Sequence, residues 1–181
     1  MNEWIDWFQR VLDVSIRLYF RQECDLSSVY DIPLPKAGPL WKALLPEQVD
    51  PTFDEWMVLM LALMPHLSPQ MLDILFVHNK NFDRPYTEFG GWKGLSHGGF
   101  LPTGETAVFL LAGDRVERRL EVVRLFREEH WFHMYHVVGL EGAGNGEPFL
   151  SGQLRISEDF LYRLSFEGEY KPDYNMGFLA K

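Results

Sequence analysis

The stretch Thr52-Phe-Asp-Glu-Trp-Met-Val-Leu-Met-Leu-Ala-Leu-Met64 decides the fold of this chain. Thr52 and Glu55 have the spacing of a capping box, in which each side chain accepts a hydrogen bond from the other residue's backbone N–H at a helix start. The run that follows, Trp56 to Met64, is apolar on every side of a helix, and such a helix lies in the middle of a core. The sequence therefore predicts a central helix from Phe53 to Met64, ending near Pro65.

On the N-terminal side of this helix, residues 3–22 have the pattern of an amphipathic helix. Its apolar side chains recur at helical spacing, as Ile5, Phe8, Leu12, Ile16 and Tyr19. Residues 25–51 hold five prolines, none of them inside a helical pattern. We therefore expect residues 1–50 to form one helix followed by an irregular, extended connection.

On the C-terminal side, helix caps and apolar faces predict four further helices. One begins at Ser68-Pro69, and the others cover residues 107–112, 115–128 and 158–164. In the helix over 115–128, the pattern turns one stripe toward the core, namely Val116, Leu120, Val123 and Phe126. The opposite stripe, Glu117, Glu121, Arg124 and Glu128, is predicted to face water.

Two strands are predicted near the C-terminus, over Phe132–Leu140 and Phe149–Ile156, and the turn-rich segment between them favours a hairpin. The predicted fold class is therefore α+β, mainly α: a helical domain with a small C-terminal β-hairpin. We expect a single domain over 1–181, with its core in residues 51–166 and a tail over 167–181.

Length, charge and composition restrict the class of protein and the kinds of partner. A length of 181 residues suits one domain, and a net charge of −9 argues against a nucleic-acid partner. The single cysteine, Cys24, fits a reducing compartment. The N-terminus lacks the basic start and apolar core of a signal peptide, and the longest apolar run is too short to cross a bilayer. These features predict a cytoplasmic protein with no membrane and no nucleic-acid partner.

The segment from Arg84 to Thr106 is rich in glycine and aromatic residues and has neither helical nor strand periodicity. Glycine permits unusual backbone shapes and close approach, and aromatic rings supply large contact areas. We predict an ordered loop that a partner packs against, with Trp92 and Phe100 as anchors. The predicted contact residues are Phe89, Gly90, Gly91, Trp92, Lys93, His97, Gly98, Gly99 and Phe100. The alternative is that both rings fold back into the core of this domain.

The end of that segment, Gly99-Phe-Leu-Pro-Thr-Gly-Glu-Thr106, resembles a phosphate-binding loop in which Glu105 replaces the lysine. Because that lysine neutralises the β- and γ-phosphates, a carboxylate in its place repels them. We therefore expect no nucleotide binding here. Thr103 is instead predicted to cap a short helix, with Glu105 opposing the helix dipole in its first turn.

Three histidines, His130, His133 and His136, form the best candidate for a metal site. Their spacing is poor, because steps of three drift round a helix and His133 would point away from the other two on a strand. No acid–base pair of carboxylates and no nucleophile elbow accompanies them. We expect no cofactor, no metal and no catalytic residue, and a metal-dependent hydrolase that uses this cluster is kept as an alternative.

Several motifs together resemble the N-terminal region of a group of bacterial AAA+ ATPases that are frequent in Bacteroidetes. Some of these are similar to the ATPases encoded with contractile injection systems. The resemblance covers most of residues 50–175 and rests on Asp54-Glu-Trp56, Leu61-Ala-Leu-Met-Pro-His66, Thr87-Glu-Phe-Gly-Gly91, His97-Gly-Gly-Phe-Leu-Pro-Thr-Gly-Glu-Thr106, Glu147-Pro-Phe-Leu-Ser-Gly-Gln-Leu-Arg-Ile-Ser157 and Gly168-Glu-Tyr-Lys-Pro172.

The resemblance implies a non-catalytic N-terminal domain that recruits a substrate or partner, or regulates the ATPase ring. Its partners would be the AAA+ ATPase core and an unidentified protein client. The chain ends before any Walker motif, so the family's ATP-binding residues have no counterparts here. We therefore expect an excised domain or a shortened relative, and a purely structural domain for ring assembly is a further alternative.

Overall fold

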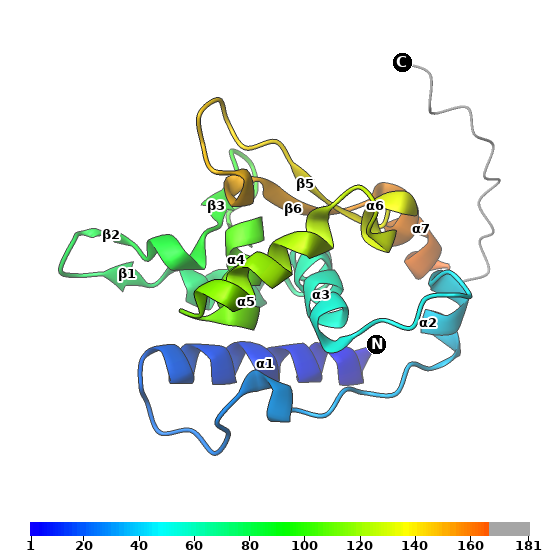
Figure 1. Cartoon of the computed structure of the whole chain (residues 1–181), viewed down its shortest axis with the longest axis horizontal. Coiled ribbons are helices and arrows are strands. Elements are labelled where there is room, and N and C mark those ends of the chain that lie inside the picture. Colours follow the sequence, from blue (N-terminus) through cyan, green and yellow to red (C-terminus); the bar gives the residue numbers. More distant parts are fainter. Residues whose placement is uncertain (167–181) are drawn as a thin grey trace.

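Helix α3 (Phe53–Leu67) runs through the centre of the computed structural model, which describes residues 1–166 (Figure 1). The capping box is present: Thr52 donates its backbone N–H to Glu55 Oε2 at 2.6 Å, and its hydroxyl accepts from the Glu55 N–H at 3.4 Å. Every side chain from Trp56 to Met64 is buried. The predicted central helix is confirmed, although it continues past Pro65 to Leu67.

Around α3, the described residues form seven α-helices and three two-stranded antiparallel sheets. This confirms the predicted fold class, α+β and mainly α. No single helix in the described range is long and apolar enough to cross a membrane; only the pair α3 and η2 (Pro69–Phe76), bent by 106°, has the required length and composition together. The predicted tail over 167–181 lies outside the described residues.

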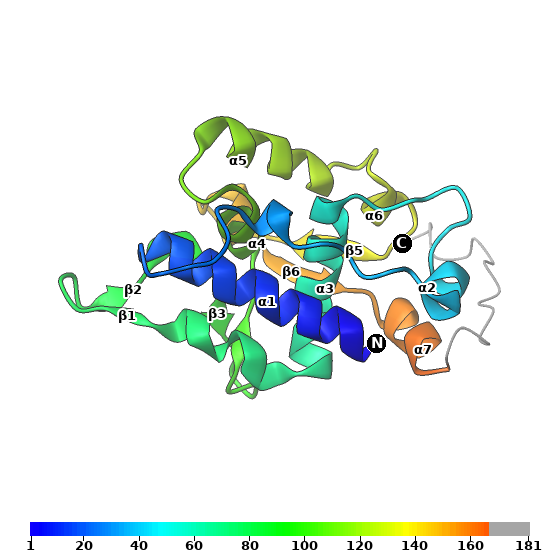
Figure 2. The same cartoon turned by 90° about the horizontal axis from the view of Figure 1, so that it is seen from below.

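Helix α1 (Asn2–Tyr19) lies across α3 (Figure 2) and shares its core. The ring of Trp4 is 4.0 Å from that of Trp56 and 5.6 Å from that of Trp41, measured between centroids. The connection after α1 is more regular than predicted. It contains η1 (Val29–Asp31) and α2 (Pro39–Leu44), in which proline occupies the first helical position, where its missing N–H costs nothing.

Helix α5 (Val116–Val123), followed by η4 (Arg124–Phe126), has Val123 and Phe126 half-buried and the predicted polar stripe exposed, but it corrects the predicted inward positions of Val116 and Leu120. Val116 and Leu120 are 63% and 64% exposed, and Val122 is buried instead. The reason is electrostatic. Arg118 and Arg119 reach inward from α5: Arg118 pairs with Asp54 on α3, and Arg119 Nη1 lies 2.7 Å from Glu105 Oε1 on α4 (Gly104–Ala112).

The C-terminal hairpin is confirmed, with shorter strands than predicted: β5 (Val138–Glu141) pairs with β6 (Gln153–Ile156) in antiparallel register. The start of the predicted first strand is instead the short helix α6 (Trp131–Met134), because the His130 side chain accepts the Phe132 N–H and caps it. The start of the second is η5 (Phe149–Ser151). Ser157 caps α7 (Glu158–Ser165) as predicted.

Candidate functional site

The segment singled out in the sequence contains several short elements. After β1 (His78–Asn79) and β2 (Arg84–Pro85) come η3 (Thr87–Phe89), β3 (Trp92–Lys93) and β4 (Phe100–Leu101). Strands β3 and β4 pair antiparallel, with Trp92 opposite Leu101 and Lys93 opposite Phe100. We call residues 89–100 the Gly-aromatic loop. Its two ends form a base against α4, and residues 92–98 form a tip.

Hydrogen bonds fix the base of the loop to the elements beneath it. The Thr106 hydroxyl donates to the Phe89 carbonyl at 2.8 Å, and the Thr103 hydroxyl accepts from the Gly91 N–H at 3.1 Å. At the other end, the Phe100 N–H donates to Asp73 Oδ1 at 3.1 Å. Both threonines are buried, so these bonds are shielded from water.

Two glycines are required at the base. Gly90 and Gly91 have φ of +59° and +75°, a region that other residues rarely adopt. A Cβ on Gly90 would lie 2.4 Å from Thr103 Oγ1, and one on Gly91 would lie 2.0 Å from Phe100 Cζ. Gly98, by contrast, has nothing within 4 Å of such a Cβ.

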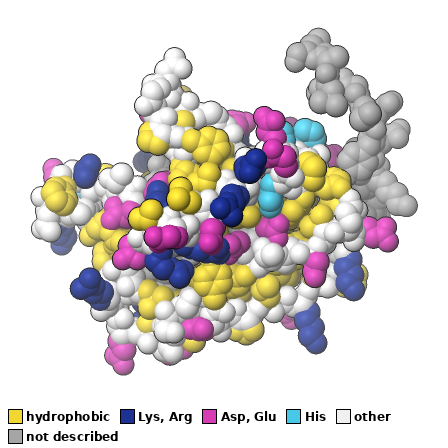
Figure 3. Space-filling view, in the orientation of Figure 1, with side chains coloured by type: hydrophobic (Ala, Val, Ile, Leu, Met, Phe, Trp, Pro, Cys, Tyr) yellow, Lys and Arg dark blue, Asp and Glu magenta, His cyan; other side chains and the backbone are white. Residues whose placement is uncertain are grey.

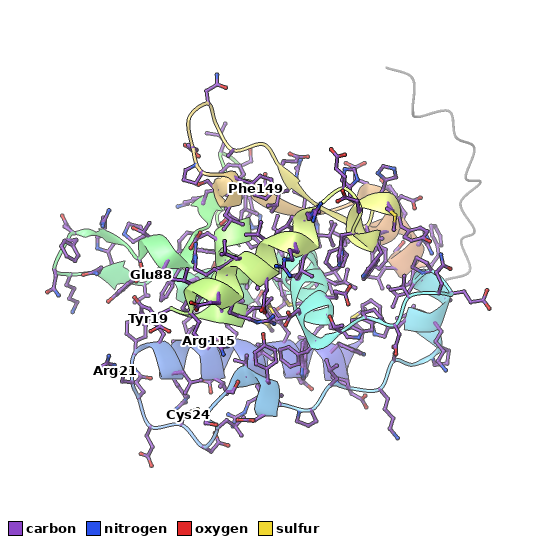
Figure 4. All side chains as sticks on the ribbon, in the orientation of Figure 1. Tyr19, Arg21, Cys24, Glu88, Arg115 and Phe149 are labelled. Atoms are coloured by element: carbon purple, nitrogen blue, oxygen red, sulfur yellow. The ribbon has the colours of Figure 1, made fainter. Side chains whose placement is uncertain are left out.

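The aromatic residues at the base belong to the core, which corrects two of the predicted contact residues. Phe89 and Phe100 are 0% and 2% exposed. The Phe89 ring packs against Phe109 on α4, with 4.4 Å between centroids, and the Tyr19 hydroxyl on α1 donates to the adjacent Glu88 (Figure 4). Burial, followed by this carboxylate, raises the pKa of Tyr19. Phe100 therefore cannot serve as an exposed anchor.

The tip of the loop is exposed. Trp92 is 43% exposed, Leu95 projects fully into solvent, and Lys93 and Gly98 are also exposed. His97 is half-buried: its ring lies over Gly99, where a Cβ would come within 2.9 Å of Nε2. Of the two predicted aromatic anchors, Trp92 is the one whose ring is available to a partner in this structure.

A groove of about 820 Å³ lies beside this tip. We call it the loop–hairpin groove. Its walls come from five segments: the loop from Trp92 to Leu101, the C-terminal end of α3, the segment from His133 to Val137, both strands of the β5–β6 hairpin and the start of α7. The lining includes both apolar and polar residues, and an ion pair between Arg155 Nη1 and Glu141 Oε2, 2.6 Å apart, spans the two strands.

Four histidines line the loop–hairpin groove: His66, His97, His133 and His136. Burial lowers the pKa of His66, and the positive charge of Arg155 and the nearby His97 lower it further. The Nε2 atom of His97 is buried and has no hydrogen-bond partner among the described residues. The groove thus offers imidazole rings, which can form hydrogen bonds, next to apolar surface.

The three histidines predicted as a cluster are divided between two places. His133 and His136 line the groove, with ring centroids 6.2 Å apart, whereas His130 Nε2 is 2.9 Å from Glu55 Oε1. Across residues 1–166, no three His, Cys, Asp or Glu side chains are placed to hold one metal ion.

His130 belongs to a hydrogen-bond network around Glu55. The Glu55 carboxylate also accepts a hydrogen bond from Trp131 Nε1 at 2.6 Å, in addition to those of the capping box. Burial raises the pKa of this carboxyl, but the hydrogen bonds from His130, Thr52 and Trp131 outweigh burial and lower it to about 2. His130 therefore has a structural role that links α6 to the start of α3.

Sequence reasoning missed much of the groove. It named Trp92 and His97 at the loop, and His133 and His136 in the histidine cluster, but not His66, Leu95 or the β5–β6 floor. No periodicity relates residues so far apart in the chain, so no sequence signal was present for them. Comparisons of the chain with protein-family models, with curated proteins and with solved structures found no match.

Proposed function

We propose that this chain is a non-catalytic recognition domain of an AAA+ ATPase, which recruits a protein client or regulates the ring. The observation that carries the proposal is the division of the Gly-aromatic loop. Its base is fixed in the core, while Trp92 and Leu95 stand exposed beside a groove of about 820 Å³. An exposed aromatic side chain next to a concave surface is a typical anchor of protein–protein contacts.

The link to an AAA+ ATPase rests on the sequence resemblance over residues 50–175. The most specific motif of that resemblance, Thr87 to Thr106, contains both the base and the tip of the loop. Within it, Glu105 forms a bidentate ion pair with Arg119, with distances of 2.7 and 2.9 Å. This carboxylate therefore has a structural partner where a phosphate-binding loop carries its lysine.

The alternative of a metal-dependent hydrolase that uses His130, His133 and His136 gains no support from their positions, because both nitrogens of His130 are engaged. Nε2 faces Glu55, and Nδ1 accepts the Phe132 N–H at 3.2 Å. The groove itself, with apolar walls and hydrogen-bonding side chains, suits a peptide segment better than a reaction centre.

Site-specific photo-crosslinking in the native cell tests the proposal. A benzophenone amino acid replaces Trp92 in the complete gene product, and the matched control places it at Phe82, which is 68% exposed on the separate β1–β2 hairpin. We expect adducts with the AAA+ ATPase or one of its clients from position 92 and not from position 82. Adducts only between copies of this domain would indicate a structural assembly role, and equal adducts from both positions would contradict the proposal.

A further inference from the structure

A second surface, separate from the Gly-aromatic loop, lies along the outer edge of β5. The Ser157 N–H donates to the Val137 carbonyl at 2.9 Å, so that Val137 and Ser157 form a hydrogen-bonded pair next to the antiparallel ladder. Hydrogen-bonded and non-bonded pairs alternate in such a ladder. Gly139 and Glu141 therefore exchange hydrogen bonds with β6, and the backbone groups of Val138 and Leu140 point away from it.

The same alternation is visible on the other side of β6. The Leu154 N–H, which opposes Leu140, points away from β5 and donates to the Pro102 carbonyl at 2.9 Å; Gly104 likewise donates to the Gly152 carbonyl at 3.1 Å. The segment 102–104 thus covers the outer edge of β6. No corresponding segment pairs with β5 in the described part of the chain.

The two outward-facing residues of β5 are not freely hydrated. Val138 is 5% exposed and Leu140 is half-buried. Among residues 1–166, no group outside the β5–β6 pair bonds to their backbone N–H or C=O. Because backbone polar groups in such surroundings are nearly always paired, an open edge of this kind is a template for another strand.

A groove of about 500 Å³ runs along this edge, and we call it the edge groove. Its apolar lining includes Leu125 and Phe126 of η4 and Phe149 of η5. Phe149 is 55% exposed and is marked at the base of the β5–β6 connection in Figure 4, where apolar side chains gather on the surface in Figure 3. No residue of the Gly-aromatic loop lines this groove.

The charge of the edge groove is acidic. Arg127 Nε lies 3.2 Å from Glu129 Oε2, so that this pair is neutral. Glu128, between them, is exposed and forms no ion pair with another described residue. A ligand with a cationic side chain near Glu128 would complement this charge.

We propose that the outer edge of β5 binds an extended segment of a partner protein by strand addition. The backbone of that segment pairs with Val138 and Leu140. Its alternate apolar side chains lie against Leu125, Phe126 and Phe149, and a Lys or Arg beside them faces Glu128. The proposal does not depend on the function assigned to the loop–hairpin groove.

The test selects a phage-displayed library of linear random peptides on the immobilised chain and measures the affinity of one enriched, synthesised peptide. The key variant is Leu140→Pro, which removes an outward N–H that β6 does not use, and Leu140→Ala is the control for the lost side chain. We expect Leu140→Pro to bind at least about tenfold more weakly than Leu140→Ala, and Trp92→Ala to bind like the unchanged chain.

Two further measurements keep the test decisive if Leu140→Pro fails to fold. N-methylation of single peptide amides should weaken binding at alternate positions, because only every second amide faces β5. Glu128→Gln should weaken the binding of a basic peptide and reduce its dependence on salt. The proposal is overturned if no peptide is enriched, if the proline and alanine variants bind equally, or if N-methylation shows no alternation.

Discussion

At the base of the Gly-aromatic loop, Phe89 and Phe100 are almost completely buried, whereas at its tip Trp92 is 43% exposed and Leu95 lies in solvent. The same residue types therefore have opposite roles within one short segment. The difference follows the hydrogen bonds: the base is held by Thr103, Thr106 and Asp73, and the tip is not. Glycine next to an aromatic residue is thus no sign of a contact surface until the surrounding backbone is known.

The largest expected effect comes from removing an aromatic ring at the base. Phe89→Ala should lower the free energy of unfolding by about 3–5 kcal/mol, because it leaves a cavity next to Phe109 and Tyr19. Leu95→Ala, at the tip, should change it by less than about 0.5 kcal/mol. Urea titration measures both, and similar losses in the two variants would break the division between base and tip.

The glycines sharpen the same comparison. Gly91→Ala should cost about 2–5 kcal/mol, from the strain of a left-handed residue and from the clash of the new Cβ with the Phe100 ring. Gly98→Ala, whose Cβ meets nothing, should be neutral or stabilising by up to about 1 kcal/mol. If denaturant titration finds Gly91→Ala as stable as Gly98→Ala, the base is not rigid.

A smaller effect is expected on the pH dependence of stability. It separates His130, which is hydrogen-bonded to Glu55, from the histidines that line the groove. Because the pKa of Glu55 is lowered to about 2 in the folded protein, its contribution to stability is present above pH ~4.5 and is lost as the pH falls toward 2. Between pH 7 and pH 3 the unchanged chain should lose about 1–2 kcal/mol more than Glu55→Gln, a value reduced for partial solvent screening.

Urea midpoints at the two pH values measure this difference. His133→Gln, which alters a groove histidine, is the control and should keep the full pH dependence of the unchanged chain. Equal losses in Glu55→Gln and the unchanged chain would mean that the network of Glu55, His130 and Trp131 contributes nothing to folding.

The parts of the fold that follow from local patterns were predictable from the sequence. The capping box of Thr52 and Glu55, the all-apolar α3 and the cap at Ser157 need no knowledge of distant residues. The orientation of α5 was not predictable, because it depends on Arg118 meeting Asp54, which is 64 positions away in the chain. An apolar stripe alone pointed Val116 and Leu120 the wrong way.

The candidate site was predictable only in part, for the same reason. The loop was recognisable from its glycines and aromatic residues, but the sequence left open whether Trp92 and Phe100 were exposed or buried, and only Trp92 is exposed. Nothing local distinguishes Phe100 from Trp92, since each follows a glycine pair. The groove is formed by α3, α6, the hairpin and α7 together with the loop, and only the tertiary structure brings these elements to one place.

The central claim is that the loop tip serves recognition and not folding, and Trp92→Ala tests it most directly. Two quantities are measured on this variant: its melting temperature, and its affinity for the partner recovered by crosslinking at position 92. We predict a melting temperature within about 2 °C of the unchanged chain and an affinity at least about tenfold lower. A fall of more than about 8 °C with the affinity unchanged would place Trp92 in the core and contradict the account.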